Sequence, residues 1–149
     1  MNDQEFTTFI TALEFAAEKH RFQRRKDEKE SAYITHPIQL VEQLWNIGEV
    51  RDSSVLTAAL MHDVIEDTST EDAEIATKFG QKILGIVKEV SDDKTLPKLI
   101  RKALQVEHAS SLSFEAKLVK LADKICNVRD IRLNTPSPAK WPHDRKVKY

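Results

Sequence analysis

One short segment of the sequence joins an apolar run to four ionisable residues. The segment reads ALMHDVIEDT, and its His62 and Asp63 are followed one helical turn later by Glu66 and Asp67. A helix turning about 100° per residue would place these four side chains within one arc of about 140°. Three carboxylates on a buried surface repel one another and lose their hydration, which is unfavourable unless a positive charge lies against them. A divalent metal ion would meet this need, since an adjacent His and Asp can both turn toward one ion.

A plainer explanation is that these residues mark a helix end entering solvent, and this segment alone does not decide between the two. Two other segments favour the metal. His36, in YITHP, precedes Pro37, which favours an extended backbone at the entrance of a helix. Asp123, in LVKLADKICN, adjoins an expected core stripe, where an acidic group needs a partner. Singly, His36 could be a cap or core histidine and Asp123 a surface ion-pair partner, but with His62 and Asp63 they form a set suited to Mn, Fe or Zn.

The elements that must position these residues are predicted to be helices, because the hydrophobic period is helical nearly everywhere. The expected helices lie within residues 6–17, 36–48, 52–67, 69–80, 81–90, 97–109 and 114–131. In the last of them, the expected core stripe is Leu118, Leu121, Ala122, Ile125 and Val128. No segment alternates with period two for long enough to form a convincing strand. We therefore predict one all-α domain over residues 1–149, a bundle of about six to eight helices.

Composition limits the partners of the chain. Its 149 residues suit a single domain, and a formal net charge of −1 gives no overall attraction to nucleic acid or acidic membranes. An anionic ligand must then be held by a local basic cluster, although a charge run such as RFQRRKDEKE is by itself more typical of a solvated loop. The single cysteine, Cys126, fits a reducing compartment. The N-terminus lacks a signal-peptide pattern and no apolar run approaches the ~20 residues of a membrane span, so we expect a cytoplasmic, soluble protein.

The ordered motifs YITHP, HDVIEDT and LADKICN resemble those of the HD-domain hydrolases, and specifically the small alarmone hydrolases. HRFQRRKD, SDDKTLPKLIRKALQVEHA and AKLVKLADKICNVRD look most like the metazoan-type branch, and the resemblance covers about residues 10–149. It implies hydrolysis of (p)ppGpp, a guanine nucleotide, with release of the 3′-pyrophosphate to leave GDP or GTP. No synthetase domain fits in this length.

The resemblance also implies roles for residues by position. The implied metal ligands, usually of Mn²⁺, are His36, His62, Asp63 and Asp123. The pair implied to orient and deprotonate the attacking water is Glu66 and Asp67. The implied substrate contacts are Arg25, Lys26, Lys98 and Asn127, together with a late R-x-x-x-Y pair, Arg145 and Tyr149.

Other functions stay open at this point. The same fold and metal could serve another nucleotide, such as the 2′-phosphate of NADPH, or the chain could be a nucleotide-binding module without turnover or a helical structural domain. Members of the branch normally continue past the position of Tyr149 with one or two helices, so we expect these to be missing or shortened, in a naturally short or a truncated chain. The sequence leaves the metal, the substrate preference and the oligomeric state open.

Overall fold

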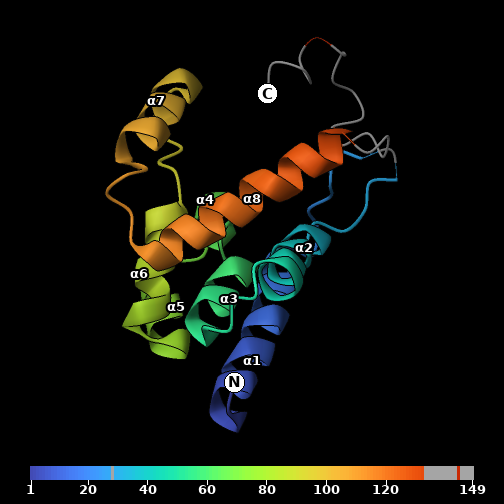
Figure 1. Cartoon of the computed structure of the whole chain (residues 1–149), viewed down its shortest axis with the longest axis vertical. Helices are drawn as coiled ribbons and strands as arrows, with labels where there is room; N and C mark the ends of the chain where they lie inside the picture. The colour runs from blue at the N-terminus through green and yellow to red at the C-terminus, as the bar shows by residue number, and fades with distance from the viewer. Residues whose placement is uncertain (28, 133–143, 145–149) are drawn as a thin grey trace.

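The computed structural model describes residues 1–27, 29–132 and 144, and every regular element within them is a helix (Figure 1). In chain order these elements are α1 (Asp3–Lys19), α2 (Thr35–Glu42), the π-helix η1 (Gln43–Ile47), α3 (Ser53–Leu60), α4 (Val64–Asp67), α5 (Asp72–Phe79), α6 (Gln81–Val90), α7 (Lys98–His108) and α8 (Phe114–Arg132). The predicted all-α fold is confirmed. None of these described helices is both long and apolar enough to cross a membrane.

Several helix ends follow from local sequence signals. The Asp52 carboxylate accepts a hydrogen bond from the Ser54 N–H at 2.8 Å and caps the start of α3. Gly80 adopts a φ of 88°, which favours glycine, and divides α5 from α6. The Ser113 hydroxyl accepts a hydrogen bond from the Ala116 N–H at 3.1 Å at the start of α8. These caps fix where the elements that carry the site begin.

The core is organised around α3. Seven of its eight residues are buried, and α1, α2, α6 and α8 all pack against it. The two segments that meet the end of α3, the start of α2 and the middle of α8, are thereby brought to one place although they lie far apart in the sequence. In Figure 1, α7 extends away from this bundle, above α6 and beside the diagonal α8.

The prediction of one continuous helix over residues 52–67 is wrong. The chain forms turns at residues 61–63, between α3 and α4. The Nδ1 atom of His62 lies 3.0 Å from the carbonyl oxygen of Ala59, which in a continuous helix would accept the N–H of Asp63. This competition from a side chain interrupts the ladder, so the four ionisable residues do not share the arc of a single helix.

The predicted core stripe of α8 is also largely wrong. The residues of α8 that are buried are Ala116, Val119, Ala122 and Cys126. Leu121, Ile125 and Val128, which the period favoured, are exposed. The helix carries two apolar stripes, and the one with the smaller side chains faces the core. Because Ala122 faces the core, the neighbouring Asp123 is turned toward the interior of the bundle.

Candidate functional site

One cleft, of about 490 Å³, collects most of the predicted site residues. It lies between the loop that follows α1, the turn between α3 and α4, and α8. Nine predicted residues line it, namely Arg25, Lys26, His36, His62, Asp63, Glu66, Asp67, Asp123 and Asn127. Lys98 instead lines an adjoining hollow, and Arg145 and Tyr149 lie outside the described residues.

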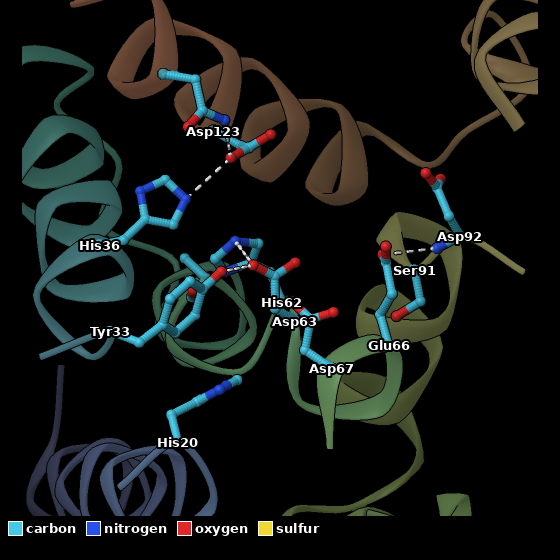
Figure 2. Close-up of polar contacts among 12 residues, drawn as sticks. His20, Tyr33, His36, His62, Asp63, Glu66, Asp67, Ser91, Asp92 and Asp123 are labelled. Atoms are coloured by element: carbon cyan, nitrogen blue, oxygen red, sulfur yellow. Dashed lines mark hydrogen bonds and ion pairs between the residues drawn. The ribbon is translucent and has the colours of Figure 1, made fainter. Parts of the chain in front are cut away.

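Two histidines and an aspartate from three different elements converge in this cleft. His36 comes from the first turn of α2, His62 from the turn after α3, and Asp123 from α8 (Figure 2). One potential ligand atom from each lies within 4.8 Å of the others. His36 Nε2 lies 3.1 Å from Asp123 Oδ1, and the two imidazole ring centroids are 5.3 Å apart. Both histidines are buried, so the group is held by the core.

His62 is oriented by its backbone contact. In the neutral ring, donation from Nδ1–H to the Ala59 carbonyl leaves Nε2 as the nitrogen with a free lone pair. Asp63 Oδ2 lies 2.9 Å from this Nε2 without the alignment of a hydrogen bond. Burial favours the neutral ring, but the charges of Asp63 and Asp123 outweigh it and raise the pKa of His62 to about 9. A metal ion would displace that proton, since only the neutral imidazole is a ligand.

Asp63 lies beside the three-residue group and is held by Tyr33. The Tyr33 hydroxyl donates a hydrogen bond to Asp63 Oδ2, and its ring packs on His20, with the ring centroids 4.7 Å apart (Figure 2). Burial and the nearby Asp63 charge raise the pKa of Tyr33 well above its usual range, so it stays a donor. Tyr33 was not among the residues predicted for the site. The available signal was its place in YITHP, three residues before His36.

The donor set fits a divalent cation. Within the described residues, the buried His62 Nε2 has no hydrogen-bond partner, and His36 turns its Nε2 toward Asp123. Asn127 Nδ2 donates to Asp123 Oδ1 at 2.7 Å, which orients that carboxylate. Two imidazoles with carboxylates held by neighbouring donors are typical of sites for Mn, Fe or Zn.

Glu66 and Asp67 lie on α4, on another wall of the cleft. Glu66 Oε2 accepts a hydrogen bond from the Asp92 N–H at 3.0 Å, while Oε1 lies 3.9 Å from Lys94 Nζ and 3.9 Å from Arg101 Nη1 (Figure 2 shows the Asp92 contact). Burial raises the pKa of Glu66. Asp67 is paired with Lys94. These two carboxylates therefore lie beside cationic side chains, whereas the carboxylates of Asp63 and Asp123 lie beside histidines.

The basic residues of the loop before α2 reach the same cleft. Arg25 forms an ion pair with Asp130 of α8, and these side chains are only 11% and 16% exposed. This burial argues against a purely solvated loop at Arg25. Lys26 and Arg24 also line the cleft. Four further cations that were not predicted for the site also line the cleft, namely Lys94, Arg101, Lys120 and Lys124.

Comparisons with known proteins agree with this geometry. The HD domain family matches residues 12–147. The guanosine-3′,5′-bis(diphosphate) 3′-pyrophosphohydrolase MESH1 of Xenopus tropicalis is 51% identical over 140 residues, covering 94% of this chain and 77% of the frog protein. The human MESH1 is 49% identical, with 97% and 80% covered. The solved structure of a metazoan ortholog of SpoT that hydrolyses ppGpp superposes with a TM-score of 0.89 at 45% identity, covering 95% of this chain and 79% of that one. The chain therefore belongs to the HD-domain family and, within it, to the small metazoan-type alarmone hydrolases.

Proposed function

We propose that this chain is a metal-dependent hydrolase of the alarmone (p)ppGpp, which releases the 3′-pyrophosphate and leaves GDP or GTP. The observation that carries the proposal is the convergence of His36, His62 and Asp123 on one point, beside Asp63 and across the cleft from Glu66. Relatives 45–51% identical to the chain are named for this reaction.

The metal site is assigned to His36, His62, Asp63 and Asp123, with Mn²⁺ as the expected ion. When bound, a divalent metal lowers the pKa of water toward neutrality and polarises a phosphoryl oxygen. Tyr33 and Asn127 keep Asp63 and Asp123 in place through the hydrogen bonds they donate. The Ala59 carbonyl fixes the tautomer of His62 that a metal needs.

Glu66 is assigned the proton transfer. Its Oε2 is occupied by the Asp92 N–H, so Oε1 is the oxygen that can accept a proton from water. Burial raises the pKa of Glu66, which makes the ionised carboxylate a stronger base than an exposed one. As the water oxygen bonds to phosphorus, one water proton passes to Glu66 and the bond between phosphorus and the 3′-oxygen breaks. The 3′-oxygen takes up a proton from solvent and leaves as the 3′-hydroxyl of GDP or GTP. Asp67, on the same turn, orients the water.

Binding of the substrate is assigned mainly to the basic residues around Glu66 and the metal site. Arg25, Lys26, Lys98 and Asn127 are its proposed contacts, joined by Arg145 and Tyr149 beyond the described helices. A chain of net charge −1 needs such a local cluster to bind a nucleotide carrying two phosphate groups at each end. We expect the protein to work in the cytoplasm, because its single cysteine, Cys126, is a buried free thiol and fits a reducing compartment.

The proposal is tested by incubating the purified protein with Mn²⁺ and ppGpp and resolving the products. We expect pyrophosphate and GDP in equal amounts, and none when a chelator is present. Parallel incubation with NADPH tests for release of orthophosphate. An inert ppGpp sample beside a cleaved NADPH sample would overturn the proposed substrate while keeping the metal chemistry.

A further inference from the structure

Two cations one helical turn apart on α7 occupy different surroundings. Lys98, the residue indicated by the family resemblance, is exposed and lines the hollow beside the cleft. Arg101 lines the cleft itself, and its side chain is 24% exposed. Its Nη1 atom lies 3.9 Å from Glu66 Oε1, beside the proposed base. Arg101 is therefore the α7 cation that faces the reacting group.

Among the described residues, the guanidinium of Arg101 has one ion-pair partner, Glu66, at 3.9 Å. Its Nε atom is buried, and no described residue accepts a hydrogen bond from it. By contrast, Lys94 is paired with Asp67 and Arg25 with Asp130. A buried donor without an acceptor is unfavourable, and the separation from Glu66 is too long for a hydrogen bond. The part of the side chain that is exposed in the cleft can therefore take an acceptor from outside the chain.

Arg101 is held in this position by polar contacts and not by the core. None of the eleven residues of α7, all of them described, is buried. Gln105, one turn after Arg101, donates a hydrogen bond to the Asp92 carboxylate, and the Asp92 N–H in turn donates to Glu66. This chain of contacts ties the inner face of α7 to the carboxylate of Glu66. These hydrogen bonds therefore keep Arg101 next to the carboxylate of Glu66.

We propose that Arg101 is a substrate-binding residue whose guanidinium binds the oxygens of a diphosphate group next to Glu66. The planar fork of N–H donors matches phosphate oxygens in a way that a lysine does not. This inference rests on the proposed function, because it takes the diphosphate to be that of the alarmone. It adds Arg101, which faces the proposed base Glu66, to the exposed Lys98 as a substrate contact on α7.

The test compares Arg101→Gln with Lys102→Gln, since Lys102 is the adjacent, exposed residue of equal charge, which lines the adjoining hollow with Lys98 but not the cleft beside Glu66. Steady-state kinetics with ppGpp and calorimetric binding of inorganic pyrophosphate are measured in Mn²⁺. We expect Arg101→Gln to lower kcat/KM and pyrophosphate affinity by about 10- to 100-fold, the usual worth of hydrogen bonds to a charged group. Lys102→Gln should stay within about twofold, and neither change should lower Tm, because α7 buries no residue.

Arg101→Lys separates the geometry from the charge. It should bind pyrophosphate more weakly than the wild type and more tightly than Arg101→Gln. If the protein hydrolyses ppGpp and Arg101→Gln matches Lys102→Gln in both measurements, the inference is overturned. If ppGpp is inert but pyrophosphate binding depends on Arg101, the proposed function fails, and Arg101 is kept only as a contact for a diphosphate of another substrate. A wild-type protein that binds no pyrophosphate overturns the inference.

Discussion

Two regions deliver side chains to the same cleft by different means. The segment from Ser53 to Asp67 passes through the centre of the bundle, and seven of the eight residues of α3 are buried. The helix α7 buries none of its residues and is tied to the cleft by the contact from Gln105 to Asp92. The first region supplies His62 and Asp63, and the second supplies Arg101.

The difference follows from what each group has to do. Metal ligands must keep fixed mutual positions, and a close-packed core provides them. A residue that binds a substrate must also admit and release it, and an element with few buried apolar contacts has low local stability. We infer that metal binding in this protein is coupled to the stability of the core, whereas the proposed contacts of α7 with substrate are not.

The largest expected effect is that of His62→Ala. Removal of this imidazole should abolish both metal binding and turnover, because it eliminates one of the converging donors. In the wild type, a chelator should lower Tm, since a ligand bound only by the folded state stabilises it. Metal analysis and thermal melting measure both effects, with Lys78→Gln as an exposed control. If a chelator leaves Tm unchanged, metal binding does not stabilise the core.

Glu66→Gln should separate catalysis from metal binding. The amide keeps the shape and can still accept the Asp92 N–H, but it cannot take a proton. Turnover should fall by about 10²–10⁴-fold, the usual contribution of a general base, while bound metal and nucleotide affinity stay the same. Metal analysis, nucleotide titration and pyrophosphate release are measured on one sample. Loss of metal in this variant would instead make Glu66 a ligand.

A pair of leucine substitutions compares the two regions directly. Leu60 in α3 is 1% exposed and Leu99 in α7 is 81% exposed. Leu60→Ala should lower the free energy of unfolding by about 2–5 kcal/mol, because it leaves a cavity in the core. Leu99→Ala should change it by less than about 0.5 kcal/mol. Urea unfolding measures both, and equal losses would show that α7 is part of the cooperative core.

The smallest expected effect is the pH dependence of stability that Glu66 causes. Burial raises its folded-state pKa above the ordinary value of 4.5, so folding favours the protonated form. The stabilisation from Glu66 is therefore complete below pH 4.5 and is lost as the pH rises through the folded-state pKa. Metal-free Glu66→Gln should then be more stable than the wild type at about pH 7 and equal to it near pH 4. Urea unfolding at the two pH values measures this. If the difference in the free energy of unfolding between variant and wild type does not change with pH, burial does not control the pKa of Glu66.

Much of the fold and of the site could be predicted from the sequence, and the errors have identifiable causes. Periodicity and caps predicted the helices, because a helix period and a cap are local properties. The continuous helix through His62 was wrong, since it is a side-chain hydrogen bond to Ala59 that ends α3. The stripe of Leu121, Ile125 and Val128 was wrong, because two apolar stripes on α8 compete and only packing selects between them.

The sequence by itself determined the fold class, the motif order and nine residues of the cleft. Only the tertiary structure decided that Tyr33 holds Asp63, that Asp130 pairs with Arg25, and that Arg101 faces Glu66 while Lys98 does not. The physical reason is that residue type and spacing fix what a side chain can do and the helix on which it lies. Its partner is set by how helices distant in sequence rotate against one another to bury their apolar faces. A rotation of α8 would change the partners of Asp123 and Asp130, and a rotation of α7 would change that of Arg101.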